Sequence, residues 1–394
     1  MIAAGDRAAV RARRLLTRAF AGAAAPLEFR LWDGSSVRAG APGPARFTVV
    51  FRSAAAFGCL LRDPSTLGLG EAFIDGAIDL EGDLFAAIAA AHEIEAIRPR
   101  LARGGAWIAR LARAIGRWRP RRQAREEIAF HYDVSNAFYA LFLDPLMVYT
   151  CAYYAEPACD LAGAQEAKLD LVCRKLALAP GERLLDVGCG WGGLLVWAAT
   201  RYRVEAHGVT LSAAQAEWAR DAARRAGVAD RVHVHLADYR DLPTDLRVDK
   251  IAAVGILEHQ GIAAYPAYFA RLHDHLRPGG LLLNQCITRD PTQPRTSAMD
   301  FLDRHVFPGG DLANGGHVAD VAEHAGLELL DVASLRAHYV RTTRDWLARL
   351  EANATHAQTL VGTRTYRAWR AYLAGAAVAF DAGWINLYQI LLAR

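Results

Sequence analysis

The chain has 394 residues, of which 53% are hydrophobic and 22% are charged, and its formal net charge is +4. This composition excludes a disordered chain, and the length predicts a small domain beside a larger one. No uninterrupted apolar run reaches the roughly 18 residues that cross a bilayer, and the arginine-rich start lacks the apolar segment of a secretory signal. We expect no nucleic-acid partner.

The cysteines are scattered along the chain. The six residues form no C-x-x-C pair, and no zinc spacing appears between them and the histidines. Free thiols suit a reducing compartment. We therefore predict a cytoplasmic protein without a metal site.

The first part of the chain alternates short helical and strand patterns. Ala8–Phe20 predicts a short basic helix, and Leu27–Trp32 and Arg46–Phe51 predict strands. Asp33-Gly34 is typical of a hairpin turn. Residues 1–97 are therefore predicted to form a small N-terminal α+β domain that contacts lipid or a partner subunit.

Residues 98–125 are rich in arginine, and we interpret them as a basic amphipathic linker helix that ends at Pro120. Apolar residues recur at helical spacing, with arginines on flanking positions: Trp107, Ile108, Leu111, Ile115 and Trp118, with Arg110, Arg113 and Arg117. Such a helix suits an anionic membrane surface. The alternative is a connecting helix whose apolar stripe packs on the protein itself, and the sequence favours neither.

Residues 126–394 begin with a regular alternation of strands and helices. The expected strands are Arg183–Val187, His207–Val209, Val232–Leu236, Lys250–Val254 and Leu281–Ile287. The expected helices are Asp160–Leu178, Leu194–Ala199, Ala213–Ala226 and Tyr265–Leu276. This pattern predicts an α/β fold with a mainly parallel sheet covered by helices on both faces. Ligands of such sheets bind at the carboxyl ends of the strands.

The strand Arg183–Val187 leads into a glycine turn, Gly188-Cys189-Gly190-Trp191-Gly192-Gly193. Glycines allow a ligand to approach the backbone closely, and the following helix offers unpaired amides. The third glycine of the dinucleotide pattern is missing, and Gly208–Ser212, where a ribose-binding acid would stand, contains no carboxylate. The turn resembles motif I of the class I S-adenosylmethionine methyltransferases. A purely structural turn is the alternative.

Further stretches carry a closer resemblance. They are His131–Asn136, Leu143–Tyr154, Gly208–Gln215, Asp238–Leu242 and Gly255–Gly261. Together they resemble the cyclopropane fatty acid synthases, including the mycolic acid cyclopropane synthases, over residues 125–394. Gly70–Asp83 also looks like the N-terminal domain of the two-domain bacterial members.

The resemblance implies a class I methyltransferase (Rossmann-like) fold and an S-adenosylmethionine site in residues 126–394. The site would be lined by Tyr149, Thr150, Asp186, Gly188, Cys189, Gly190, Gly192, Thr210, Leu211, Ser212, Gln215, Asp238 and Tyr239. Asp186 could receive the ammonium of the amino acid end, directly or through water. Core packing is the alternative for the two tyrosines.

The family acts on an isolated alkene in a lipid chain. Methyl transfer produces a carbocation, and a proton must then leave the added methyl so that the ring can close. The resemblance implies that a bound bicarbonate takes this proton. Its holders would be Cys151, Glu258, Gln285, Ile287 and Tyr339. Glu258 could instead cap the following segment, and Cys151 could be a small buried hydrophobe.

Two positions depart from the family pattern. Gln285 stands where the family has a histidine, so an amide donor replaces an imidazole and the proton removal is in doubt. Ala376 stands where some members have a cysteine, and a carbocation mechanism does not need that thiol.

We therefore predict an enzyme that converts unsaturated acyl chains of phospholipids to cyclopropane fatty acids. It would work in the cytoplasm on the inner face of an anionic membrane. The sequence does not decide between a monomer and a homodimer. One rival reaction gives a methyl- or methylene-branched chain, and another methylates an amine. A non-catalytic lipid-binding protein is the rival from another class, and the presence of Glu258, Cys151 and Tyr339 argues against it.

Overall fold

The computed structural model describes residues 4–63, 65–97, 135–293, 296–306 and 310–394. By contacts the chain forms two compact units. The first contains, of the described residues, 4–97, 296–306 and 354–378, and the second contains 135–293, 310–353 and 379–394. Residues 296–306 and 354–378 lie within the range predicted for the methyltransferase domain, 126–394, but by contacts they belong to the first unit. The boundaries of the functional domains stay a prediction. The linker 98–125 lies outside the described residues.

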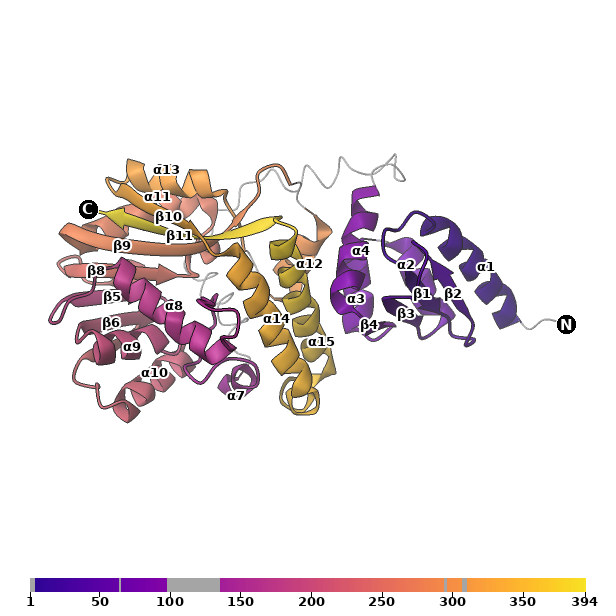
Figure 1. The fold of residues 1–394 in the computed structure, drawn as a ribbon, viewed down its shortest axis with the longest axis horizontal. Helices are drawn as coiled ribbons and strands as arrows, with labels where there is room; N and C mark the ends of the chain where they lie inside the picture. Colours follow the sequence, from indigo (N-terminus) through magenta and orange to yellow (C-terminus); the bar gives the residue numbers. More distant parts are fainter. Residues whose placement is uncertain (1–3, 64, 98–134, 294–295, 307–309) are drawn as a thin grey trace. The chain divides into compact units, whose positions relative to one another are not determined.

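The first unit is built on a four-stranded sheet in the order β2-β1-β3-β4 (Figure 1). Its strands are β1 (Leu27–Arg30), β2 (Ser36–Ala39), β3 (Phe47–Phe51) and β4 (Ile78–Gly82). Its helices are α1 (Ala4–Ala19), α2 (Ala54–Arg62), α3 (Thr66–Ile74), α4 (Leu84–Ile97), α12 (Ser297–His305) and most of α15 (Ala354–Asp381). β1 pairs with β2 antiparallel, as the turn at Asp33-Gly34 predicts. The α+β character of this part of the chain is confirmed.

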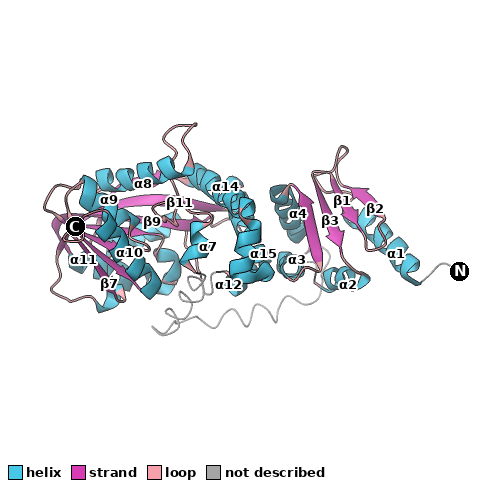
Figure 2. Cartoon of the chain, turned by 90° about the horizontal axis from the view of Figure 1, so that it is seen from below, coloured by secondary structure: helices cyan, strands magenta, loops and turns pink. Residues whose placement is uncertain are grey.

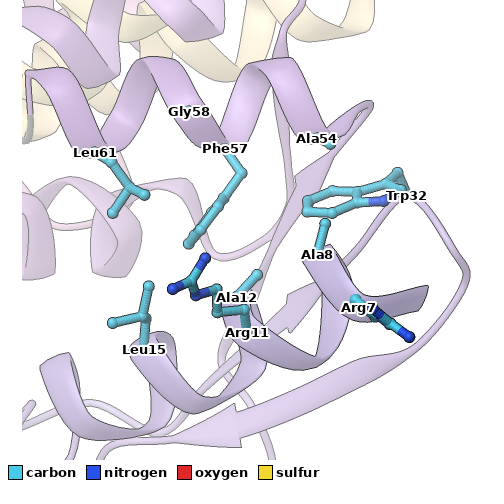
Figure 3. A pocket seen from close by; sticks show the side chains of 10 residues that line it. All are labelled: Arg7, Ala8, Arg11, Ala12, Leu15, Trp32, Ala54, Phe57, Gly58 and Leu61. Carbon is cyan, nitrogen blue, oxygen red and sulfur yellow. The ribbon is translucent and has the colours of Figure 1, made fainter. Parts of the chain in front are cut away.

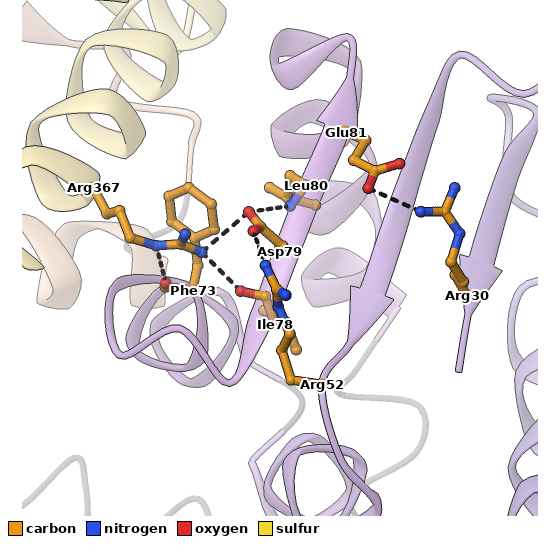
Figure 4. Close-up of polar contacts among 8 residues, drawn as sticks. All are labelled: Arg30, Arg52, Phe73, Ile78, Asp79, Leu80, Glu81 and Arg367. Atoms are coloured by element: carbon orange, nitrogen blue, oxygen red, sulfur yellow. Dashed lines mark hydrogen bonds and ion pairs between the residues drawn. The ribbon is translucent and has the colours of Figure 1, made fainter. Parts of the chain in front are cut away.

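Arg367 on α15 joins this late helix to the N-terminal sheet (Figure 4). Its guanidinium donates to the carbonyls of Phe73 and Ile78 at 2.6 and 2.8 Å, and to the Asp79 carboxylate at 3.3 Å. The same group lies 4.2 Å over the Phe73 ring. Phe73 lies in the last turn of α3, where its carbonyl also accepts from the Gly76 amide at 3.1 Å, so Arg367 adds a second donor at the end of this helix.

The second unit is built on a seven-stranded sheet in the order β10-β11-β9-β8-β5-β6-β7. The strands are β5 (Arg183–Val187), β6 (Glu205–Thr210), β7 (Val232–Leu236), β8 (Val248–Val254), β9 (Leu276–Arg289), β10 (Glu328–Ser334) and β11 (Ile385–Ala393). The helices are α7 (Asn136–Ala140), α8 (Leu161–Lys175), α9 (Gly193–Arg201), α10 (Ala213–Arg225), α11 (Tyr265–His275), α13 (Gly315–His324) and α14 (Arg336–Ala352). Short 3-10 turns are η2 (Tyr239–Asp241), η3 (Leu257–His259) and η4 (Ile262–Ala264).

The parallel core of this sheet is confirmed. β5 pairs with β6 and β8 in parallel, as β6 does with β7 and β8 with β9. β11 runs antiparallel between β9 and β10. The regular alternation of strands and helices earlier in the chain does not predict this antiparallel strand.

Helices cover both faces of the sheet (Figure 2). On the face covered by α9 and α10, Leu195 and Ala219 belong to one buried hydrophobic core. On the opposite face, Tyr268 and Phe269 of α11 belong to a second one. Among the described residues, no helix has both the length and the apolar character of a membrane span.

Candidate active site

The site is expected at the carboxyl end of β5, because the strand order reverses there. β5 lies between β6 and β8, so the chain winds to one side through β6 and β7 and then returns to the other through β8 and β9. The loops at this switch point diverge and leave a crevice in which α/β proteins bind ligands.

Three glycines shape the loop after β5, and each has a positive φ. A Cβ at Gly188 (φ +76°) would lie 1.9 Å from the Ile256 side chain, and one at Gly192 (φ +83°) would lie 2.7 Å from Ala219. A Cβ at Gly190 (φ +54°) would meet no protein atom within 4 Å. Gly188 and Gly192 therefore serve packing, whereas Gly190 leaves backbone accessible to a ligand.

Beneath this loop lies a buried pair of charges. Burial raises the pKa of Asp186, and the charge of Lys168 opposes this effect. Burial lowers the pKa of Lys168, against the charges of Asp144 and Asp186. The Lys168 ammonium donates a 2.9 Å hydrogen bond to the Thr150 hydroxyl. Asp186 thus offers a buried carboxylate to a cationic ligand group, and Lys168 fixes the neighbouring Thr150.

The loop after β6 is held by short-range hydrogen bonds. The Thr210 hydroxyl donates to Gln215 Oε1 at 2.8 Å and accepts from the Ser212 amide at 3.2 Å. The Ser212 hydroxyl in turn accepts from the Gln215 amide and caps α10. Leu211, between them, is partly exposed. Because the Gln215 side-chain oxygen is held by Thr210, its side-chain nitrogen points in one fixed direction.

The next two predicted residues follow β7. The Asp238 carboxylate accepts from the Arg240 amide and pairs with its guanidinium, which fixes the turn η2. The Tyr239 hydroxyl donates to Gln260 Oε1 at 3.0 Å, and its ring packs edge-on against Tyr268. Asp238 thus fixes its own turn, and Tyr239 is held against the loop that follows β8.

Two of the expected cofactor residues have clear packing roles. Tyr149 belongs to an aromatic cluster, with its ring centroid 5.3 Å from Tyr139 and 5.1 Å from Trp346. Tyr149 is half-buried, so packing leaves part of the side chain accessible. Cys189 is buried, and a Cβ on Gly208 would lie 2.8 Å from its side chain. The Cys189 thiol packs β5 against β6.

The loop after β8 carries Glu258, a residue that is only 9% exposed. Its Oε1 accepts a 2.6 Å hydrogen bond from the Ile287 amide, and its Oε2 is buried without a partner among the described residues. Burial raises the pKa of Glu258 to about 7, against the hydrogen bond from Ile287. An acceptor oxygen in this state requires a donor from a ligand or a proton of its own. The structure thus brings Glu258 and Ile287 together.

Gln285 is buried on β9, directly opposite Gln389 of β11. Its Oε1 accepts a 3.0 Å hydrogen bond from Gln389 Nε2. The oxygen of the Gln285 amide is therefore committed to β11, which leaves its nitrogen to face the other way.

Cys151 and Tyr339 are both associated with α14. The Cys151 thiol is fully buried, 3.8 Å from the Leu335 carbonyl and 4.0 Å from the Thr342 hydroxyl. Burial raises the pKa of Cys151 well above its ordinary value, so it remains a neutral thiol at pH 7. Tyr339 stacks on Phe380 at 4.6 Å.

Sequence reasoning missed three residues that position the site: Lys168, Thr342 and Gln389. Lys168 could have been noticed, because on α8 it falls on the same face as Ala164, Leu169 and Val172, which are buried. Gln389 gives a weaker signal, a polar residue inside the apolar run of β11.

Comparisons with known proteins show the family of the chain. Residues 119–390 match the family model described as mycolic acid cyclopropane synthetase, and residues 13–96 match a domain of unknown function. A "Probable fatty acid methyltransferase" of Pseudomonas putida is 42% identical over 379 residues, which is 94% of this chain and 92% of that protein. A similarly named protein of Mycobacterium tuberculosis is 36% identical over 94% of this chain and 91% of its own length.

Solved structures show the same relationship. The cyclopropane synthase MmaA2 of M. tuberculosis superposes with a TM-score of 0.67 at 33% identity, over 71% of this chain and all of its own. The mycolic acid cyclopropane synthase CmaA1, solved with SAH and CTAB, gives a TM-score of 0.66 at 34% identity, over 70% of this chain and 99% of its own. The chain therefore belongs to the mycolic acid cyclopropane synthetase family and has the fold of a class I S-adenosylmethionine-dependent methyltransferase.

Proposed function

We propose that the protein transfers a methyl group from S-adenosylmethionine to the double bond of an unsaturated fatty acyl chain of a phospholipid, and that the product is a cyclopropane fatty acid. The names of two relatives support the acyl substrate, since both are called probable fatty acid methyltransferases. The accessible backbone at Gly190 and the buried Asp186 support a site for the methyl donor.

The observation that carries the proposal is the unpartnered Oε2 of Glu258. A buried carboxylate oxygen without a donor fits a small hydroxyl-bearing anion such as bicarbonate. Glu258 would accept from its hydroxyl, and the Gln285 amide and the Tyr339 hydroxyl would donate to its other oxygens. The Ile287 amide already donates to Glu258, so it orients that carboxylate instead. When bound, bicarbonate supplies a base near the reacting carbons.

In the first step the alkene electron pair forms a bond to the sulfonium methyl while the S–CH3 bond breaks, which releases S-adenosylhomocysteine as a neutral thioether and leaves the neighbouring carbon cationic. Loss of a proton from the added methyl then lets it close onto that carbon. The residues of the chain have to exclude water and keep the base oriented. Burial of Cys151 and Gln285 serves the first purpose, and the bonds Glu258–Ile287 and Gln285–Gln389 serve the second.

The second candidate reaction starts with the same methyl transfer and differs in which carbon loses the proton and in whether the ring closes. If the proton leaves a neighbouring chain carbon, or leaves the methyl without closure, the product is a methyl- or methylene-branched chain. Gln285 favours this rival, because an amide cannot take up a proton as an imidazole can.

Ozonolysis of the product separates the two reactions. The full-length enzyme is incubated with S-adenosylmethionine and unsaturated phospholipid vesicles, and the modified fatty acids are isolated and treated with ozone. A cyclopropane survives, whereas a branched alkene is cleaved at the modified position. Cleavage would overturn the ring assignment and leave methyl transfer intact.

We further propose that the enzyme works on the inner face of an anionic membrane. In the first unit, a surface groove of about 560 Å³ between α1 and α2 is lined by apolar side chains and by Arg7 and Arg11 (Figure 3). Leu15 and Leu61 of this groove are 43% and 56% exposed. Exposed apolar and cationic groups side by side suit acyl chains and lipid phosphates, and each arginine near such a surface contributes about 1 kcal/mol.

Vesicle sedimentation tests the membrane proposal. Replacing Arg7 and Arg11 by glutamine, or Arg110, Arg113 and Arg117 by glutamine, should weaken binding to anionic vesicles and flatten its salt dependence. Arg231→Gln, at an exposed arginine of the second unit, is the matched control. If neither replacement changes sedimentation, both segments serve only the fold.

A further inference from the structure

Strands β6 and β7 gather four polar residues on one face at the edge of the sheet. His207 and His233 are register partners, and Glu205 and His235 lie two residues away on the same two strands. Side chains alternate along a strand, so these four share one face. The intervening Val232 and Val234 pack into the core under α9 and α10, which places the polar four on the opposite face.

Three of the four side chains converge. Glu205 Oε1 lies 3.2 Å from His207 Nε2 and 3.6 Å from His233 Nε2. The ligand atoms of the three residues all lie within 4.8 Å of one another. In a tetrahedral zinc site with bonds of 2.0–2.1 Å, neighbouring ligand atoms are about 3.3 Å apart. The two distances to Glu205 match this spacing without a change of backbone.

The surroundings hold two of these ligands in place. Arg183 Nε donates to the other carboxylate oxygen of Glu205 at 3.1 Å, which leaves Oε1 free to face the histidines. His207 Nδ1 lies 3.5 Å from His235 Nε2. A histidine that binds a metal through Nε2 usually donates its Nδ1–H to such an acceptor, and this second contact fixes its ring.

We propose that Glu205, His207 and His233 bind one divalent transition-metal ion of the zinc type, with His235 as the hydrogen-bond partner of His207. The side chains of the three ligands are 38%, 16% and 40% exposed, so water can fill the fourth position. The ion would join the edge strand β7 to β6, the strand that ends at Thr210 in the proposed cofactor site. The sequence pattern does not predict this site, because none of its ligands is a cysteine and the ligands come from two different strands.

The site is tested on the untagged full-length chain after treatment with a chelator and dialysis. Zinc is titrated by calorimetry, and Co²⁺ is used as a spectroscopic probe, because tetrahedral Co²⁺ has intense visible bands. We expect one ion per chain, a visible Co²⁺ spectrum, and a rise in the melting temperature with zinc that EDTA reverses.

His233→Ala should weaken zinc binding by about tenfold or more and remove the Co²⁺ bands. Glu205→Gln, which keeps an acceptor for Arg183, should also weaken it and serves as the second variant if His233→Ala unfolds. His356→Ala, at an exposed histidine of α15, is the matched control and should bind like the wild type. Absence of binding in the wild type, or binding that survives in both site variants, would overturn the proposal.

Discussion

The proposed cofactor half of the site and its proposed catalytic half are held together over different distances along the chain. In the cofactor half, Thr210 bonds to Gln215 five residues away, and Asp238 bonds to Arg240 two residues away. In the catalytic half, Glu258 and Ile287 are 29 residues apart, and Gln285 and Gln389 are 104 apart. In the first half, the loops after β6 and β7 are local turns, and only Tyr149 and Thr150 depend on the more distant Trp346 and Lys168. The second half depends on the register of β9 and β11 and on the packing of α14.

The two halves also differ in how their polar groups are satisfied. Thr210, Ser212 and Gln215 bond one another, so that loop is complete without a ligand. Glu258 Oε2 and Gln389 Oε1 are buried without partners among the described residues. A substitution in the cofactor half should therefore change affinity for the methyl donor, and one in the catalytic half should change turnover, product or stability.

The sharpest test of this division is Glu258→Gln. Turnover should fall about 100-fold or more, because the variant loses the carboxylate that orients the base, a loss in the range of general-base effects. Affinity for S-adenosylmethionine, measured by calorimetry, should stay within a factor of about 3. Turnover within tenfold of the wild type would contradict the role given to Glu258. Gln285→His, which restores the family residue, should cost far less.

Gly190→Val should nearly abolish binding of S-adenosylmethionine, because its side chain would fill the space next to the accessible backbone. Gly227→Val is the matched control. Gly227 also has a positive φ (+69°) and open space at its Cβ, so both variants carry similar backbone strain. Calorimetry on the folded variants decides, and equal affinity in both would remove the glycine loop from the cofactor site.

The stability of the enzyme should report the charge of Glu258. Its pKa is raised from 4.5 to about 7 by burial, so the native state holds a proton that the unfolded state releases. The contribution of Glu258 to stability therefore falls as pH rises from about 4.5 through about 7 and stays low above. From pH 5.5 to pH 8.5, the free energy of unfolding of Glu258→Gln should rise by about 1–2 kcal/mol relative to that of the wild type. Urea unfolding of both proteins at the two pH values measures this difference. The same pH dependence in both proteins would contradict the prediction.

The smallest expected effect belongs to Gln389→Leu. The variant removes the donor that commits the Gln285 oxygen, so the Gln285 amide can turn and the base is held less tightly. We expect a loss of turnover of only about 3-fold, together with a larger fraction of ozone-cleavable product. Gln358→Leu on α15 is the control. An unchanged product ratio would show that Gln389 matters only for packing.

The contrast between the halves also explains what could be predicted from the sequence. The bounds of β5 and β7 are those expected from apolar runs between turn residues, and the glycine loop was found because its residues are neighbours in the chain. The pairing of Gln285 with Gln389 could not be found, since it follows from the antiparallel insertion of β11, which no local pattern indicates. The role of Lys168 required knowing which face of α8 is buried. The residues expected to bind the methyl donor and bicarbonate stay a prediction.

The contacts of Arg367 bear on how the chain folds during synthesis. The N-terminal sheet leaves the ribosome early, but the guanidinium that donates to the carbonyls of Phe73 and Ile78 belongs to a residue 294 and 289 positions later. Until that residue emerges, the end of α3 and the face of Phe73 lack their native partner. The first domain to be translated is thus among the last to be completed, and a nascent chain must keep this face from aggregating meanwhile. A fragment that stops before α15 is expected to be less soluble than the full chain.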